Sequence, residues 1–149
     1  NLIPELVKDK RVIIVDDSIV RGTTCKARVN TLKEAGAQEV HVRVSCPPHQ
    51  HPCVYGIDFP DRAKLMAANY SLDEIRGYLN ADSLAYLSQK GMVEATGLGK
   101  ESFCMACYDG EYPVPYDPKL EKNIIERRRA RVEGFGEALA KEEKQIKLL

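Results

Sequence analysis

The clearest apolar pattern near the start of the chain is an unbroken run, Val12–Val15, that ends at two aspartates, Asp16 and Asp17. Every residue of the run is β-branched and a turn follows at once, which is typical of a strand buried on both faces of a parallel sheet. Ligands of open parallel sheets bind beyond the carboxyl ends of the strands. The two aspartates fall at such an end.

A helix and a second strand are predicted directly after this turn. In Thr24–Ala35, the apolar residues Val29 and Leu32 share one helical face, and Gly36 follows as a typical end of a helix. The alternating segment Glu39–Ser45 then predicts a strand. A strand, a helix and a strand in this order form a βαβ unit, so the two strands should be parallel, with a right-handed crossover.

The remainder of the chain alternates between proline-rich loops and helical patterns. Prolines prevent regular structure across Cys46–Pro60, which carries two cysteines and two histidines, and across Pro113–Pro118. Lys119–Leu149 is highly charged with helical periodicity. Its run Arg127–Arg129 could form a nucleic-acid patch, but interleaved acids favour a solvated helix. The short helices predicted between these segments are Arg62–Ala68, Ser71–Leu79 with a capping box of Ser71 and Glu74, and Ser83–Gln89 with Asp82 as its cap and Gly91 at its end.

Composition narrows the class of protein. The chain of 149 residues has equal numbers of acidic and basic residues, so neither nucleic acid nor an acidic membrane is an expected partner. No apolar run approaches the ~20 residues of a membrane span. Five cysteines, an odd number without a secretory signal, indicate free thiols or metal ligands in a cytoplasmic protein. Because Asn1–Lys10 offers no earlier strand to pair with Val12–Val15, we expect the chain to be a piece of a longer protein.

The residues after Val15 have the chemistry of a sugar phosphate site. Asp16 and Asp17 can bind sugar hydroxyls, or a divalent cation that carries hydroxyls. The Ser18 hydroxyl, the flexible Gly22 and the N–H groups at the start of the next helix suit a phosphate. The aspartates could instead only cap the turn, but a plain turn has no need of so many small and hydroxyl residues. The stretch therefore predicts a ribose 5-phosphate site.

This stretch, Arg11–Thr24 with the sequence RVIIVDDSIVRGTT, resembles the phosphoribosyl pyrophosphate (PRPP) motif of type I phosphoribosyltransferases. The resemblance implies that the acidic pair binds the ribose hydroxyls and the associated Mg²⁺, while the loop wraps the 5-phosphate. Arg21 could compensate phosphate charge or simply face solvent. The PRPP-binding residues that the resemblance implies are Asp16, Asp17, Ser18, Arg21, Gly22, Thr23 and Thr24, with Asp16 and Asp17 also on Mg²⁺.

The cysteines offer a second candidate site. Cys104 and Cys107 have the CxxC spacing of a metal or redox pair, and Cys53 offers a third soft ligand in a proline-rich loop. One interpretation is an iron–sulfur cluster, which uses four thiolates. Another is a zinc site of three cysteines with His51 or His49 as the fourth ligand. A third is that the thiols are unrelated, and the residues alone leave all three open.

The order of four motifs, the PRPP motif, HPCVYGID, ADSLAYLS and CMAC, resembles the glutamine phosphoribosylpyrophosphate amidotransferase family from about Leu6 to about Tyr112. In the cluster-containing branch of that family, cysteines at the positions of Cys53, Cys104 and Cys107 bind a [4Fe–4S] cluster. The family's remaining ligand lies upstream of the PRPP motif and would be missing here. The cluster would tie the C-terminal segment to the core rather than take part in catalysis.

Two further cysteines do not match the family's ligand positions. We interpret Cys25 as a helix thiol and Cys46 as a loop thiol, with a role for Cys46 as a substitute fourth ligand as the alternative.

The resemblance implies an α/β chain with a partial Rossmann-like type I phosphoribosyltransferase fold. A parallel βαβ core would precede short helices, an irregular cysteine-bearing segment and a charged C-terminal helix. Residues 1–112 would be the C-terminal part of a phosphoribosyltransferase domain with the cluster ligands, and residues 113–149 a linker and a charged helical tail.

The implied activity is that of a glycosyltransferase in the first step of purine synthesis. Ammonia freed from glutamine in a separate glutaminase domain displaces pyrophosphate at C1 of PRPP and gives 5-phosphoribosylamine. Because the chain starts at Asn1, without the family's N-terminal cysteine nucleophile, it would hold no catalytic residue and would be inactive alone. We expect the whole enzyme to be a homo-oligomer that binds PRPP, glutamine and purine nucleotide inhibitors. The alternatives are another PRPP-dependent phosphoribosyltransferase or a non-enzymatic PRPP- or metal-binding module.

Overall fold

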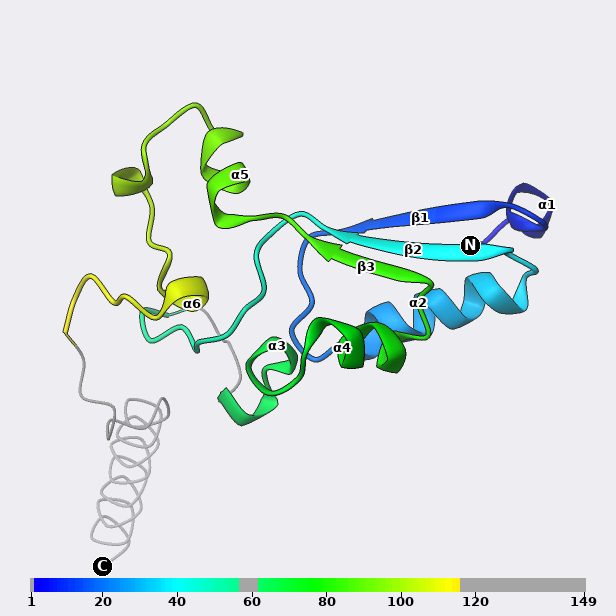
Figure 1. Cartoon of the computed structure of the whole chain (residues 1–149), viewed down its shortest axis with the longest axis horizontal. Coiled ribbons are helices and arrows are strands. Elements are labelled where there is room, and N and C mark those ends of the chain that lie inside the picture. The colour runs from blue at the N-terminus through cyan, green and yellow to red at the C-terminus, as the bar shows by residue number, and fades with distance from the viewer. Residues whose placement is uncertain (1, 57–61, 116–149) are drawn as a thin grey trace, which may run out of the picture. The chain divides into compact units, whose positions relative to one another are not determined.

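Three parallel strands form the sheet of the described part of the chain. The computed structural model describes residues 2–56 and 62–115. The strands β1 (Arg11–Asp16), β2 (Glu39–Val44) and β3 (Ser83–Tyr86) lie side by side in this order (Figure 1). Arg11 pairs with Glu39 and Asp16 with Val44, so the ends of β1 and β2 coincide. The parallel βαβ core predicted from the sequence is confirmed.

The two main helices lie on the same side of this sheet and pack against each other (Figure 1). Helix α2 (Thr23–Glu34) connects β1 to β2 and is followed by Gly36 at a φ of +90°. Helix α4 (Leu72–Leu79) precedes β3. Its predicted capping box is present, because the Glu74 N–H donates to Ser71 Oγ at 3.3 Å and the Ser71 N–H donates to Glu74 Oε2 at 2.7 Å.

The remaining elements of the described residues are short. They are α1 (Pro4–Val7), α3 (Met66–Asn69), α5 (Gln89–Glu94), α6 (Ala106–Asp109), and the 3₁₀ turns Arg62–Lys64 and Lys100–Ser102. Helix α6 carries Cys107 in a segment that otherwise has little regular structure.

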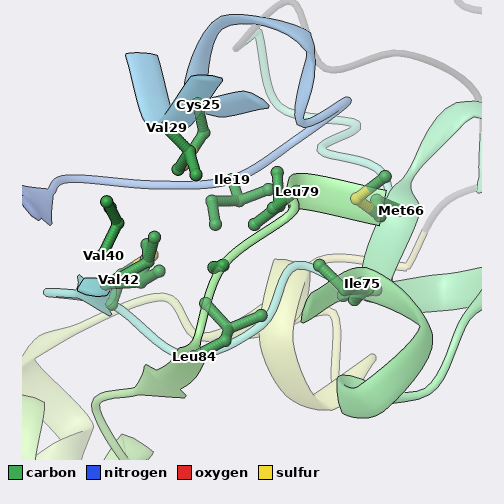
Figure 2. Close-up of a cluster of buried hydrophobic side chains, with 13 residues drawn as sticks. Ile19, Cys25, Val29, Val40, Val42, Met66, Ile75, Leu79 and Leu84 are labelled. Atoms are coloured by element: carbon green, nitrogen blue, oxygen red, sulfur yellow. The ribbon is translucent and has the colours of Figure 1, made fainter. Parts of the chain in front are cut away.

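The hydrophobic core lies between the sheet and the two main helices (Figure 2). Val40 and Val42 of the central strand β2 meet Val29 of α2 and Leu79 of α4 there, and all four are 0% exposed. Full burial of such a side chain contributes roughly 1.5–3 kcal/mol. The core therefore anchors the carboxyl end of the sheet, where the candidate ligand site lies.

The face of β1 that points away from α2 and α4 is exposed to solvent in the described part of the chain. Ile13 and Val15 are 63% and 73% exposed, whereas Val12, Ile14 and Asp16 on the inner face are half-buried. The prediction that this strand is buried on both faces is wrong for the described part of the chain. The reason is that β1 lies at the edge of the sheet and both main helices cover the same face.

The predicted helix Ser83–Gln89 is wrong. Ser83–Tyr86 forms β3 instead, and a helix starts only at Gln89. Asp82 does not cap a helix: its N–H donates to the Val40 carbonyl at 2.9 Å, and its Oδ2 accepts from the Val40 N–H at 2.7 Å. These two bonds align the following residues with β2. A short apolar run carries too little periodicity to separate a strand from a helix.

Two other helix boundaries differ from the prediction. Gly91 lies in the first turn of α5 and donates its N–H to the capping Ser88 Oγ at 3.0 Å, so it does not end a helix. The predicted helix Arg62–Ala68 is broken at Leu65, whose φ and ψ of −80° and 116° are extended. Leu65 is fully buried. The break thus places an apolar side chain in the core.

The chain divides into two compact units, Asn1–Pro113 and Val114–Leu149, and all the elements above belong to the first. The predicted charged helix Lys119–Leu149 lies outside the described residues, as does the end of the predicted loop Cys46–Pro60. The predicted roles of residues 1–112 and 113–149 stay predictions. In the described segments, no helix combines the length and the apolar character needed to cross a membrane.

Candidate functional site

The two aspartates at the end of β1 differ in exposure and in partners. The Asp16 side chain is 16% exposed, and its Oδ1 accepts a hydrogen bond from Arg28 Nη1 of α2 at 3.0 Å. Asp17 is exposed, and its Oδ1 accepts from the Ser18 N–H at 2.7 Å. The turn therefore presents one carboxylate that is already paired with an arginine and one that faces solvent.

Backbone contacts fix the loop between β1 and α2. The Asp16 carbonyl accepts from the Ser45 N–H, just beyond β2, at 2.9 Å, and the Val20 carbonyl accepts from the Met66 N–H at 2.9 Å. Between them, the Ile19 side chain is 2% exposed and belongs to the core (Figure 2). The core and the backbone thus both hold the loop in place.

Gly22 marks the point where the loop turns into α2. Its φ of +75° lies in the left-handed region, which glycine adopts without strain. A Cβ at this position would lie 2.9 Å from Met66 Sδ and 3.3 Å from Tyr78 Cε1. Gly22 is therefore required by its backbone conformation and by close packing.

The N-terminus of α2 offers hydrogen-bond donors next to the acidic pair. The first N–H groups of a helix have no acceptor within the helix, and Gly22, the residue at the cap position, has no side chain to supply one. Thr23 and Thr24 are exposed and add two hydroxyls, and Arg21 is exposed beside them. Partial positive charge and free donors at a helix N-terminus favour an anion. The structure thus places all seven predicted PRPP residues on one strand, loop and helix start.

Magnesium fits this site only together with a ligand that brings further oxygens. In the residues described, no group of three or more His, Cys, Asp or Glu side chains could hold a metal ion. Mg²⁺ commonly binds through one or two carboxylates plus substrate phosphates. Asp16 and Asp17 provide such a pair, of which Asp17 is exposed.

The loop after β2 and the segment around α6 are joined by hydrogen bonds. The Cys107 carbonyl accepts from the N–H groups of Gln50 and His51 at 3.0 and 3.1 Å. The Tyr112 hydroxyl donates to the Pro52 carbonyl at 2.7 Å. These contacts connect two segments that are far apart in the sequence, and they bring both cysteine-bearing stretches together.

Cys53, Cys104 and Cys107 converge in this region. Burial raises the pKa of the Cys107 thiol, and the nearby Cys53 and Cys104 raise that pKa further. The three thiols thus interact electrostatically, yet they form no group that could hold a single metal ion within the described segments. Tetrahedral zinc requires all its sulfurs at about 2.3 Å from one ion, whereas a four-iron cluster spreads its thiolates around a larger body. Three thiols have the soft-ligand chemistry that both an iron–sulfur cluster and a zinc site use, so both interpretations stay open.

Sequence reasoning missed the side chains that support the two sites. Met66 and Tyr78 pack against Gly22 although both lie more than 40 residues after it in the sequence. No local motif predicts this contact. Arg28 could have been found, because it lies one helical turn after Thr24 and so faces the end of β1. Cys25 and Cys46 lie in α2 and in the loop after β2, as predicted, and both are buried.

Comparisons with known proteins agree with this geometry. The phosphoribosyl transferase domain family matches residues 2–58, which include β1, the loop, α2 and β2. The amidophosphoribosyltransferase of Mycobacterium tuberculosis is 44% identical over 153 residues, which cover 96% of this chain and 29% of that protein. The amidophosphoribosyltransferase of Synechocystis sp. is 52% identical over 125 residues, which cover 84% of this chain and 25% of that protein.

Solved structures give the same result. Glutamine PRPP amidotransferase from B. subtilis, complexed with ADP and GMP, superposes with a TM-score of 0.73 at 44% identity, over 78% of this chain and 27% of that one. A structure of the allosteric regulatory enzyme of purine biosynthesis gives a TM-score of 0.74 at 44% identity, over 80% of this chain and 26% of that one. The chain thus spans between 25% and 29% of the length of these relatives. By sequence and by fold, the chain belongs to the amidophosphoribosyltransferase family, and it corresponds to about a quarter of the length of the matched members.

Proposed function

We propose that this chain supplies the PRPP-binding loop of an amidophosphoribosyltransferase, which transfers glutamine-derived ammonia to C1 of PRPP and yields 5-phosphoribosylamine, pyrophosphate and glutamate. One observation carries the proposal. The exposed carboxylate of Asp17 lies at the end of β1, and the uncapped start of α2 follows across Gly22, where an added Cβ would lie 2.9 Å from Met66 Sδ. Family membership supplies the reaction, and the loop geometry supports the ligand.

Each part of the loop has a separate task in this proposal. The 5-phosphate binds at the start of α2, where backbone N–H groups and hydroxyls converge. The acidic pair binds the ribose hydroxyls and holds C1 in place while pyrophosphate leaves and ammonia arrives. Positive charge develops on the ribose in such a displacement, so fixed carboxylates act through positioning and electrostatics. Bound Mg²⁺ supplies charge neutralisation for the pyrophosphate. The phosphate donors are the N–H groups of Arg21, Gly22 and Thr23 and the hydroxyls of Ser18, Thr23 and Thr24.

Arg28 gives the two carboxylates different roles. Its guanidinium pairs with Asp16, which is largely covered, and leaves Asp17 exposed. We assign Asp16 mainly to orientation of the ribose and Asp17 to the ligand and its cation.

We also propose that Cys53, Cys104 and Cys107 are ligands of a structural [4Fe–4S] cluster, with a fourth ligand outside these three. Their convergence and the hydrogen bonds between their segments support it. The cluster would hold α6 to the loop after β2. For the native protein, glutamine, purine nucleotides such as those in the B. subtilis complex, a homo-oligomeric state and a cytoplasmic location are further proposals.

The test is the affinity of the native polypeptide that contains this sequence for PRPP with Mg²⁺, measured by calorimetry. Asp17→Asn should weaken binding about tenfold or more, equivalent to about 1.4 kcal/mol. Asp73→Asn, which removes a carboxylate with a 90% exposed side chain on α4, is the charge-matched control. The formation of phosphoribosylamine from ammonium and PRPP should fall with Asp17→Asn as well. Equal PRPP affinity of wild type and Asp17→Asn would remove the Asp17 carboxylate from the site.

A further inference from the structure

The start of α2 carries a cation where a helix ordinarily carries an acid. The partial positive charge of a helix N-terminus favours acidic side chains and disfavours basic ones nearby. Helix α4 follows this rule with Asp73 and Glu74 in its first turn, whereas α2 has no acid in its first turn. Lys26 lies one helical turn after Gly22, and its N–H donates to the Gly22 carbonyl at 2.9 Å. The side-chain charges at the two helix starts are thus opposite.

An aromatic ring of α4 holds this lysine beside the loop. Lys26 Nζ lies 4.1 Å from the centroid of the Tyr78 ring, a distance at which the face of the ring attracts an ammonium group. Cε1 of the same ring lies 3.3 Å from the position of a Cβ added at Gly22. Side chains of a helix lean toward its N-terminus, so Lys26 covers the turn that begins at Gly22. The ring therefore places the ammonium next to the phosphate end of the PRPP loop.

The ammonium of Lys26 remains available to an anion. Within residues 2–56 and 62–115, no ion pair joins Lys26 to a carboxylate, whereas Arg28 pairs with Asp16 and Lys33 with Asp82. The Tyr78 side is open to solvent, since this residue is 40% exposed. An aromatic ring orients a cation without neutralising its charge. A phosphate group can therefore still take up the full charge of the lysine.

We propose that Lys26 is a further binding residue for the 5-phosphate of PRPP and that the Tyr78 ring positions its ammonium for this contact. The inference rests on the proposed function, because it adds a charge to the phosphate end of the same loop. A hydrogen bond between an ammonium and a phosphate oxygen is roughly twice as strong as one between neutral groups. Contact with the ring also restricts a flexible side chain before the ligand arrives, which reduces the entropy lost on binding.

Lys26→Gln tests the proposal, since it removes the charge and keeps most of the side chain, and Lys26→Arg restores a charge. Tyr78→Leu removes the aromatic face but keeps an apolar side chain, whereas Tyr78→Phe keeps the ring. Lys90→Gln on α5 is the charge-matched control, because the Lys90 side chain is 83% exposed. Calorimetry measures the affinity of the native polypeptide for PRPP with Mg²⁺ and for ribose 5-phosphate, which lacks the pyrophosphate.

Lys26→Gln should weaken the binding of both ligands by the same factor, about fivefold or more, because they share the 5-phosphate. Lys26→Arg should restore most of the affinity. Tyr78→Leu should weaken binding about threefold, and Tyr78→Phe should stay near the wild type, because the attraction depends on the ring face. Urea unfolding of the same samples separates these losses from a destabilised fold.

Unchanged affinity of Lys26→Gln for ribose 5-phosphate would overturn the proposal. A loss for PRPP alone would do the same, because it would place the lysine at the pyrophosphate. An equal loss in Lys90→Gln would also overturn it, since the effect would then follow from net charge.

A failure of this inference can be told apart from a failure of the proposed PRPP loop. If Asp17→Asn weakens PRPP binding and Lys26→Gln does not, only the role of Lys26 and Tyr78 is lost. A wild-type protein that binds neither PRPP nor ribose 5-phosphate would overturn both the inference and the proposed function.

Discussion

The two candidate sites of this chain are held in place in different ways. The PRPP loop is fixed by regular structure, since β1 ends at Asp16, α2 begins at Thr23, and Gly22 between them packs closely against the Met66 side chain. The cysteine region has little regular structure and depends on long-range hydrogen bonds, such as those from Gln50 and His51 to the Cys107 carbonyl. The first site needs one neighbourhood of the sequence to fold, whereas the second needs two distant segments to meet.

This difference leads to an expectation about perturbations. A change in the cysteine region should affect metal retention and the local stability of that region, with little effect on PRPP. A change in the loop or the sheet should affect PRPP affinity and global stability, with little effect on the cluster.

The largest difference between the effect on cluster retention and the effect on PRPP affinity is expected for Cys104→Ser. Cys104 is exposed and has little packing to lose, but a serine hydroxyl is a poor ligand for iron in place of a thiolate. The half-life of the cluster in the native polypeptide should fall about tenfold or more, while PRPP affinity stays near the wild-type value. Absorption spectroscopy and calorimetry on the same samples measure the two effects.

Cys25→Ala is the matched control, because Cys25 is a buried thiol of α2 that is not one of the three proposed ligands. It should leave the cluster intact and lower the stability of the helix that carries the phosphate donors. A loss of PRPP affinity in Cys104→Ser with the cluster retained would contradict the separation.

The next largest effect is expected from Gly22→Ala. Alanine at a φ of +75° costs about 1–2 kcal/mol, and the contact of its Cβ with Met66 adds about 1–3 kcal/mol of overpacking. Gly97→Ala is the matched control, since Gly97 has a φ of +71° and nothing within 4 Å of its Cβ position. Urea unfolding should show a larger loss of free energy for Gly22→Ala, and only this variant should lose PRPP affinity. Equal losses in the two variants would mean that the contact with Met66 has no energetic weight.

The sequence predicted the parts of the molecule that local chemistry determines. Short-range patterns were enough for β1, α2, β2 and the capping box of α4, and for the acidic pair next to a helix start. Prediction failed at Ser83–Gln89, where four residues of β3 are aligned by the bonds between Asp82 and Val40, 42 positions apart. The prediction that β1 is buried on both faces also failed, because Ile13 and Val15 are exposed. The topology of the sheet, which the local pattern does not contain, decides which face the helices cover.

The candidate sites show the same limit. The residues of the PRPP loop are contiguous and could be listed from the sequence, but the pairing of Asp16 with Arg28 could not be read from the motif. The cysteine spacing left cluster, zinc and unrelated thiols open. The packing of the His49 ring against the Tyr108 ring depends on how the loop after β2 meets α6, which is a tertiary contact without a local signal.

The smallest and most selective difference should come from acid. The pKa of Asp82 is lowered, mainly by the hydrogen bond from the Val40 N–H and further by Lys33. A carboxyl group with a lowered folded pKa stabilises the protein above its unfolded pKa of about 3.9 and loses that contribution as the pH falls through the folded value. The sheet under the PRPP loop should therefore weaken between about pH 5 and about pH 3, a range that brackets the unfolded pKa of aspartate.

Asp82→Asn should flatten this acid dependence, because the amide oxygen can still accept from Val40 but no longer titrates. The measurement is the free energy of unfolding by urea at several pH values across that range, with Asp73→Asn as a control on the exposed side of α4. Amide hydrogen exchange in the same samples should show the acid effect at Val40, and much less at the N–H groups of Gln50 and His51 that donate to the Cys107 carbonyl. An equal acid effect at both places would mean that sheet and cysteine region unfold as one unit, and the contrast between the two sites would then hold only for ligand binding.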